Sequence, residues 1–218
     1  TTVEVTKSDL TTGEELPGAK LQVVDESGKI VDEWVSEKEP HVIKELAAGK
    51  TYTLVETKPA DGYVTAERVE FTIEDTVEIQ KVKMEDDVTK VEISKTDITG
   101  KKELPGAKLT ILNSEGKVVE SWVSSDKPHY IEKLPIGTYT LREEQAPDGY
   151  LVAEDITFEV KDTAEIQKVI MKDEAKPTDV PKTGDETNLW IPAILMLLSA
   201  AGLAGFAVSR RKKKRKNG

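Results

Sequence analysis

Apolar and polar residues alternate along most of the first 175 residues of this chain. A period of two is typical of half-buried β-strands, because successive side chains of a strand point to opposite faces. No segment before Leu189 has a convincing helical period. The clearest alternating positions in the first half are Val3 and Val5, Leu21 and Val23, Tyr52 and Leu54, Val69, Phe71 and Ile73, and Val82 and Met84.

Turn-forming residues separate these runs. Pro17-Gly18 fits the central positions of a type II turn, whereas Ser27-Gly28 and Asp61-Gly62 fit the ends of hairpins. Short strands with regular turn signals predict an all-β fold, namely an antiparallel β-sandwich.

The pattern occurs twice. Shifting the chain by 88 residues lays residues 3–9 on residues 91–97, and after Gly137 the shift becomes 87 because Lys50 has no counterpart. We therefore predict two tandem sandwich domains. The predicted organisation is a domain at 1–87, a domain at 88–174, a spacer with a sorting motif at 175–183, and a removable membrane segment with a basic tail at 184–218.

The end of the chain carries topology signals. The pentapeptide Val180-Pro181-Lys182-Thr183-Gly184 is followed by an uncharged stretch, 189–208, and by a basic run, 210–216. Twenty helical residues span about 30 Å, the thickness of a bilayer core, so we predict a C-terminal transmembrane helix. The basic run places everything before it outside the cell. On topology alone, a permanent single-pass anchor is the alternative to a processed signal.

In this order the three features resemble the LPXTG-type cell-wall sorting signal of Gram-positive surface proteins, with Val180 in place of the usual Leu. The resemblance implies a secreted, wall-anchored protein with a transient membrane anchor. It also implies that a sortase cysteine attacks the Thr183 carbonyl, releases the segment from Gly184 onward, and passes Thr183 to an amine of peptidoglycan or of a pilus subunit. The nucleophile then belongs to the sortase, and this chain is its substrate.

Charge and composition narrow the function further. The chain has 31 Lys and Arg against 41 Asp and Glu, and seven of the basic but only two of the acidic residues lie in 184–218, so the remainder has a net charge of −15. Such a surface argues against nucleic acid as a partner. There is no cysteine, so no disulfide stabilises the domains. Because the chain begins Thr1-Thr2-Val3 within a strand pattern and its other end requires export, we expect it to be the C-terminal piece of a longer secreted protein.

Three ionisable residues of each repeat continue the apolar face of a strand. Lys7 follows Val3 and Val5 in register, and Glu56 and Asp86 likewise follow two apolar positions of their own strands. The equivalent residues of the second repeat are Lys95, Glu143 and Asp173. The pattern allows two interpretations: these residues meet inside the core, or each lies at a strand end with its charge in water.

Inside a core the three groups could react with one another. Burial favours the neutral forms of an amine and of a carboxylic acid. A neutral amine is a nucleophile, a protonated carboxyl group is an electrophile, and a second acid can move the protons. The product would be an amide between side chains, formed with loss of one water. Closing a loop from residue 7 to residue 86 would stabilise the domain by about 4.5 kcal/mol without cysteine or an oxidant.

Sequence motifs around these residues resemble those of Cna B-type (SpaA-like, prealbumin-like) domains of Gram-positive adhesins and pilins. The motifs are Lys-x-Asp at 7–9, Leu-Pro-Gly-Ala at 16–19, and Glu-x-x-Ala-Pro-x-Gly-Tyr at 143–150. The resemblance covers both repeats and implies Lys–Asp isopeptide bonds catalysed by the Glu. The implied bonds are Lys7 to Asp86 with Glu56 as catalyst, and Lys95 to Asp173 with Glu143 as catalyst.

The chain departs from the family pattern in two ways. Its acceptors are Asp where Asn is more common, and Asp87 adjoins Asp86, so the pattern leaves open which of the two is the acceptor. The first repeat also reads Pro59-Ala60 where the motif has Ala-Pro.

Other chemistry has little support. His41 and His129 occupy the same repeat position without a Cys or a second His nearby, which favours a structural role over a metal site. Trp34 and Trp122 are interpreted as packing residues. The sequence contains no phosphate loop, dinucleotide fingerprint, nucleophile elbow or calcium loop. We expect no cofactor, no metal, and no enzymatic activity beyond one autocatalytic event per domain.

The sequence therefore predicts the stalk of a wall-anchored adhesin or minor pilin that lifts an upstream, host-binding domain off the wall. One alternative is a module that binds a host ligand directly, although no contiguous exposed apolar patch can be read from the pattern. The other is the polymerising backbone of a pilus, which by family resemblance carries a Tyr-Pro-Lys-type motif; none occurs in this sequence.

Overall fold

The computed structural model describes residues 1–177. These residues form strands, turns and loops without any helix, in two sandwich-like domains, so the predicted all-β fold is confirmed for this part of the chain. Accordingly, nothing within residues 1–177 is a helix of the length and apolarity that a membrane span needs. The predicted transmembrane helix at 189–208 lies outside the described residues, as do the sorting motif at 180–184 and the basic run at 210–216.

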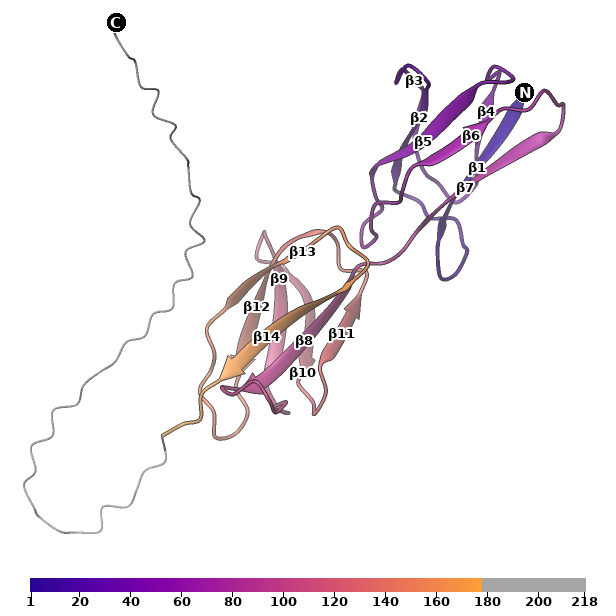
Figure 1. Ribbon diagram of the computed structural model, residues 1–218. Coiled ribbons are helices and arrows are strands. Elements are labelled where there is room, and N and C mark those ends of the chain that lie inside the picture. Colours follow the sequence, from indigo (N-terminus) through magenta and orange to yellow (C-terminus); the bar gives the residue numbers. More distant parts are fainter. Residues whose placement is uncertain (178–218) are drawn as a thin grey trace, which may run out of the picture. The chain divides into compact units, whose positions relative to one another are not determined.

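The strands make up two copies of one arrangement (Figure 1). The first repeat contains β1 (Thr2–Asp9), β2 (Lys20–Asp25), β3 (Ile30–Val35), β4 (His41–Lys44), β5 (Thr51–Lys58), β6 (Val69–Thr72) and β7 (Ile79–Asp86). The second contains β8 (Lys90–Asp97), β9 (Lys108–Asn113), β10 (Val118–Val123), β11 (His129–Glu132), β12 (Gly137–Gln145), β13 (Ile156–Val160) and β14 (Ile166–Asp173).

Each repeat has a three-stranded and a four-stranded sheet. In the first repeat the orders are β4-β1-β7 and β3-β2-β5-β6, and in the second they are β11-β8-β14 and β10-β9-β12-β13. Neighbouring strands are antiparallel except for the first and last strands of each repeat: β7 runs parallel to β1, and β14 runs parallel to β8. The alternating pattern did not reveal these parallel pairs, because side chains have a period of two in either orientation.

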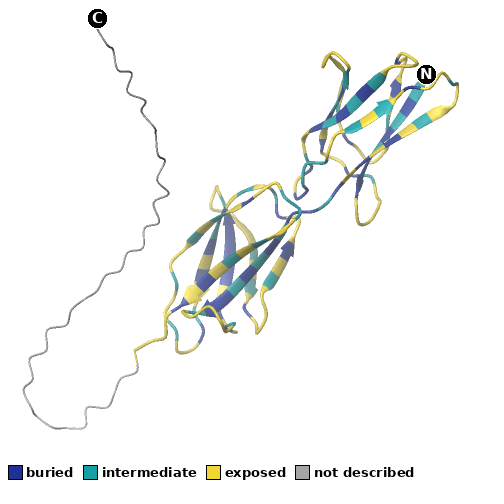
Figure 2. Ribbon diagram, in the orientation of Figure 1, coloured by how far each residue is buried: buried dark blue, intermediate teal, exposed yellow. Residues whose placement is uncertain are grey.

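The alternation in the sequence becomes the inward and outward faces of the strands (Figure 2). In β1, for example, Val3, Val5 and Lys7 are buried and the residues between them are partly exposed. The core of the first repeat consists of Val3, Val5, Leu21, Val23, Ile43, Leu46, Tyr52, Leu54, Ile73, Val82 and Met84. The corresponding core of the second consists of Val91, Ile93, Ala107, Leu109, Ile111, Ile131, Leu134, Tyr139, Leu141, Val160 and Met171. Both cores and the strand pairings around them lie within residues 1–177.

The three predicted turns are present in the structure. Gly18 has a φ of 101°, the positive value that the third position of a type II turn requires, and Ser27-Gly28 joins β2 to β3. Asp61-Gly62 also form a turn, and the consecutive strands on either side of it, β5 and β6, are antiparallel neighbours. These residues lie in the connection between β5 and β6, where the adjacent Tyr63 pairs with Val88.

Candidate functional site

Three strands of the first repeat bring the predicted residues together. Lys7 lies on β1, and Asp86 lies on its parallel neighbour β7. Because Lys7 is opposite Met84 in the register, Asp86 is two residues farther along the same inward face. Glu56 comes from β5 of the opposing sheet. The site therefore spans the core between the two sheets.

The amine of Lys7 contacts both carboxyl groups. Its Nζ lies 2.8 Å from Glu56 Oε1 and donates a hydrogen bond to Asp86 Oδ1. The backbone N–H of Ala66 donates a 2.7 Å hydrogen bond to Glu56 Oε2. One oxygen of Glu56 is thus held by the backbone while the other faces the amine.

The second repeat reproduces this geometry. Lys95 Nζ lies 2.9 Å from Glu143 Oε1 and donates a hydrogen bond to Asp173 Oδ1. The backbone N–H of Ala153 donates a 2.7 Å hydrogen bond to Glu143 Oε2. All six predicted residues are therefore brought together, three in each repeat.

All six side chains are buried. Lys7 and Lys95 are only 2% and 1% exposed, so their charges do not sit at solvated strand ends. Burial raises the pKa of Asp86 to about 7. The nearby Lys7 amine lowers this pKa, whereas the nearby Glu56 carboxyl group raises it. Burial likewise raises the pKa of Asp173. Within residues 1–177, Asp86 Oδ2 has no hydrogen-bond partner, which further favours a neutral carboxyl group.

Asp87, the neighbouring acid, forms its hydrogen bonds with other residues than Lys7. Its Oδ1 accepts a 2.7 Å hydrogen bond from the N–H of Val88, and its Oδ2 accepts a 2.8 Å hydrogen bond from Lys90 Nζ. Its side chain is partly exposed, whereas that of Asp86 is fully buried. Of the two acids, Asp86 is the one in contact with Lys7.

An amine, an acceptor carboxyl group and a second acid in mutual contact, away from water, are the groups that an amide condensation needs. The described residues include no cluster of three or more His, Cys, Asp or Glu side chains suited to a metal ion.

The histidines pack against the tryptophans. His41 of β4 stacks on Trp34 of β3 with 4.1 Å between the ring centroids, and its Nε2 lies 2.9 Å from Asp32 Oδ2. His129 stacks on Trp122 in the same way. Because β3 and β4 are edge strands of opposite sheets, the stack joins the two sheets at one side of the sandwich. This position agrees with the structural role expected for all four rings.

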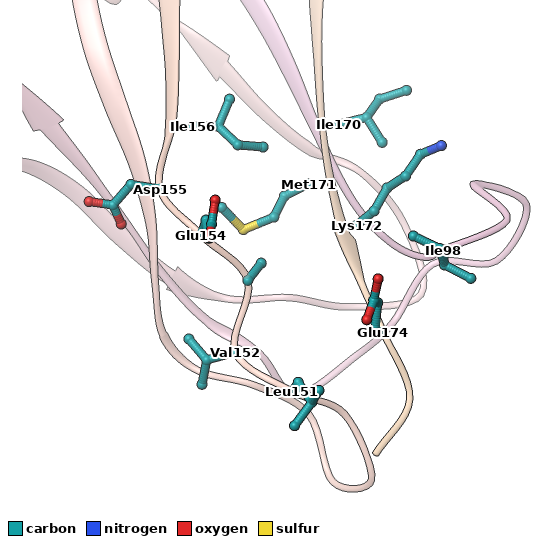
Figure 3. A pocket seen from close by; sticks show the side chains of 11 residues that line it. Ile98, Leu151, Val152, Glu154, Asp155, Ile156, Ile170, Met171, Lys172 and Glu174 are labelled. Atoms are coloured by element: carbon teal, nitrogen blue, oxygen red, sulfur yellow. The ribbon is translucent and has the colours of Figure 1, made fainter. Parts of the chain in front are cut away.

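An open hollow of about 580 Å³ borders the second site beside β14 (Figure 3). Several apolar side chains that line it are exposed, namely Ile98 at 57%, Leu151 at 44%, Val152 at 59% and Ile170 at 50%. The sequence pattern did not reveal this group of exposed apolar residues, because they are distant in sequence and meet only in the fold. The first repeat has Thr65 and Lys83 at the positions of Val152 and Ile170, so its equivalent edge is more polar.

Comparison with known protein families identifies the family of this chain. A family model of the SpaA prealbumin-like fold domain matches residues 1–88 and again residues 89–175. The chain belongs to this SpaA family. A second model, the LPXTG cell wall anchor motif, matches residues 180–215. This SpaA-family protein is thus a secreted, cell-wall-anchored, pilin-like surface protein of the Gram-positive type, as both sequence resemblances indicated.

Several solved structures are similar to this chain. The Bacillus anthracis TIE protein is 35% identical over 79% of this chain and 34% of its own length, with a TM-score of 0.51. The chain thus spans well under half of that protein. A streptococcal ancillary pilin is 20% identical over 81% of this chain and 62% of its own, with a TM-score of 0.38. The shaft pilin SpaA from Lactobacillus rhamnosus GG is 16% identical over 81% and 98%, with a TM-score of 0.38. The comparison with curated proteins gave no match.

Proposed function

We propose that this SpaA-family chain is the wall-proximal stalk of a surface adhesin or minor pilin, and that each repeat is stiffened by one intramolecular Lys–Asp isopeptide bond. The observation that carries the proposal is the burial of Lys7 and Lys95, each in contact with an Asp and a Glu. An unreacted buried ion pair contributes little net stability, so a site of this kind in both repeats favours a reactive role. In this proposal the chain catalyses only its own cross-linking.

The proposed bond of the first repeat joins Lys7 Nζ to Asp86 Cγ. A proton passes from the ammonium group to the carboxylate, which leaves a neutral amine and a neutral acid. The amine attacks Cγ while the Glu56 carboxyl group hydrogen-bonds the carbonyl oxygen. Glu56 then transfers the amine proton to the departing hydroxyl group, which leaves as water. The atoms balance without an oxidant or cofactor, and Lys95, Asp173 and Glu143 would react in the same way.

Such a bond would change which part of the repeat bears tension. Force along the chain enters the first repeat at β1 and leaves it after β7. Without the bond, force can shear these parallel strands apart, and the chain segment between Lys7 and Asp86, which are 79 residues apart, can then extend. With the bond, force passes directly from Lys7 to Asp86. The sequence between them then carries no load, which is what a stalk under shear requires.

Single-molecule force spectroscopy on a protein held at its two ends tests this function. The wild-type repeats should give no unfolding step. Glu56→Gln should release the first repeat in a step of roughly 250 Å, the extended length of the freed segment. Glu143→Gln should release the second. Unfolding steps of that size in the wild type would overturn the proposal.

At the other end of the chain we propose Thr183 as the residue that becomes covalently attached. The match of residues 180–215 to the cell wall anchor motif supports processing by a sortase. The acceptor amine would belong to peptidoglycan or to a pilus subunit, and an upstream domain would carry any host ligand.

The hollow beside β14 favours one alternative, a module that binds a host ligand directly. Val152→Thr together with Ile170→Lys would install the residues of the first repeat, so the fold should tolerate both changes. The stalk proposal predicts that bacteria with this double variant attach to host surfaces as well as the wild type does. Loss of attachment would favour the binding module.

A further inference from the structure

A lysine of the second repeat contacts the end of the first. Lys133 lies between β11 and β12, and its Nζ donates hydrogen bonds of 2.6 Å to Tyr63 Oη and 3.1 Å to Asp9 Oδ2. Tyr63 Oη in turn donates a 2.7 Å hydrogen bond to the same oxygen of Asp9. The Lys133 ammonium also lies 4.8 Å from the centroid of the Tyr63 ring. The three side chains form a closed polar triangle between the repeats.

Backbone contacts surround this triangle. The N–H of Thr89 donates a 3.0 Å hydrogen bond to the carbonyl of Gly62, and the N–H of Thr65 donates one of 2.8 Å to Asp162 Oδ1. Gly62 approaches the second repeat so closely that a Cβ atom on it would lie 2.5 Å from the carbonyl oxygen of Lys133. A side chain at position 62 is therefore incompatible with this approach.

Hydrogen bonds within the triangle favour the charged forms of Asp9 and Lys133. Burial opposes the charge of Asp9, but hydrogen bonds from Tyr63, Thr12 and Lys133 outweigh it and hold the pKa of Asp9 well below its usual range. Hydrogen bonds to Tyr63 and Asp9 raise the pKa of Lys133. Both groups therefore stay charged across the neutral range.

The first repeat carries the same loop with the opposite charge. Glu45 is the counterpart of Lys133, and the two have φ values of 65° and 61°. The N–H of Glu45 donates to Thr1 O over 3.0 Å, as the N–H of Lys133 donates to Thr89 O over 3.1 Å. The two loops thus have one backbone geometry, but a Glu at the tip would repel an acceptor such as Asp9.

We propose that Lys133, Tyr63 and Asp9 form an inter-repeat lock, which holds the two repeats as one rigid unit. The acceptor pair on the first repeat is a docking surface for a loop with a lysine at its tip. Through this charge the lock distinguishes the second repeat from a copy of the first, so it fixes the order of the modules. The lock goes beyond the proposed function and does not depend on isopeptide bonds.

Nitrogen-15 NMR relaxation of a protein comprising residues 1–177 tests the lock, because it reports a rotational correlation time for each repeat. The wild-type repeats should share one value. Gly62→Ala should separate the values, since the added Cβ meets Lys133 O. Gly149→Ala is the matched control: it lies in the same Asp-Gly-Tyr turn of the second repeat, with φ of 85° against 87°, but no atom lies within 4 Å of its Cβ position. Both variants strain a turn, and only Gly62→Ala should release the repeats.

Substitutions of Lys133 test the charge. Lys133→Met keeps the apolar part of the side chain and removes the charge, whereas Lys133→Glu places the residue of the first repeat at the tip of the loop. Both variants should shorten the correlation times toward that of a single repeat. The effect of Lys133→Glu should be the larger. Lys127→Met, which removes an exposed lysine of the same repeat, should leave them unchanged. Independent tumbling of the wild-type repeats, or no change in Lys133→Glu, would overturn the lock. The intact mass of the same samples reports the isopeptide bonds separately, so failure of the lock is distinguishable from failure of the proposed function.

Discussion

Glu56 Oε1 lies 2.8 Å from Lys7 Nζ, although the two residues come from opposite sheets of the first repeat. The contact crosses the core beside Met84, and the Ala66 N–H orients the other oxygen of Glu56. In the proposed reaction, Glu56 would carry protons between the amine and the Asp86 carboxyl group without being consumed. The predictions that follow depend on this arrangement and on its copy in the second repeat.

Glu56→Gln should lower the melting temperature of the first repeat and leave that of the second nearly unchanged. In the loop-entropy account, a covalent bond between Lys7 and Asp86, which are 79 residues apart in sequence, would stabilise the folded state relative to the unfolded state by about 4.5 kcal/mol. For a domain of this size that corresponds to a fall on the order of 20 °C. Differential scanning calorimetry measures both transitions, and Glu143→Gln should show the reverse pattern. Equal melting temperatures in the wild type and Glu56→Gln would contradict a stabilising cross-link.

The acceptor can be identified by substituting each of two neighbouring acids. Asp86→Ala should prevent the first bond, because its carboxyl group is the one in contact with Lys7, and the intact mass should show one water fewer lost. Asp87→Ala should leave the bond intact, since that side chain bonds Val88 and Lys90. Asp86→Asn, which keeps the shape of the site, should still react, with loss of ammonia in place of water. The opposite result for Asp86 and Asp87 would transfer the acceptor role to Asp87.

Much of this site could be predicted from the sequence because strand parity is a local property. Lys7 continues the inward face that begins with Val3 and Val5, and no knowledge of the partner strand is needed to see it. The parallel pairing of β1 with β7 was not predictable in this way. It depends on which strands become neighbours, and that is decided by packing between residues about 80 positions apart.

Without the amine, the stability of the first repeat should fall as the pH rises. Burial raises the pKa of Asp86 in the folded state, and Lys7 opposes that increase, so Lys7→Met should raise this pKa further. A folded-state pKa above the unfolded value gives stability that is full below the unfolded pKa and is lost as the pH rises through the folded pKa. Between pH 5 and 7 the loss should be about 1.4 kcal/mol per pH unit.

Urea unfolding of Lys7→Met at several pH values measures this slope. The double variant Lys7→Met with Asp86→Asn is the control, because it lacks the titrating carboxyl group and should show a much smaller slope. Stability of Lys7→Met that increases from pH 5 to pH 7 would show that Asp86 is not the buried acid described above.

The contacts of Lys133 had no counterpart in the sequence pattern. Lys133 and Glu45 occupy one repeat position as two ordinary surface charges, and only the fold reveals that Lys133 meets Asp9 and Tyr63. The apolar hollow beside β14 was missed for the same reason, since Ile98 and Leu151 lie in separate connections. Periodicity identifies the faces of strands, whereas contacts between connections depend on the tertiary arrangement.

Sorting should cleave the chain between Thr183 and Gly184. Protein released from the cell wall by a peptidoglycan hydrolase should carry a peptide ending at Thr183, linked through its carboxyl group to a wall fragment. Mass spectrometry of the C-terminal peptide makes this measurement, and Thr183→Pro should leave the protein in the membrane fraction. Recovery of wall-fraction protein with residues 184–218 still attached would rule the cleavage out.

The most direct measurement is the intact mass of a protein comprising residues 1–177. The account predicts a mass two waters below that of the sequence, because Lys7 joins Asp86 and Lys95 joins Asp173. Glu56→Gln and Glu143→Gln should each restore one water, and the double variant should restore both. A wild-type protein that is fully folded and has the unmodified sequence mass would contradict the account, and both sites would then be buried ion pairs.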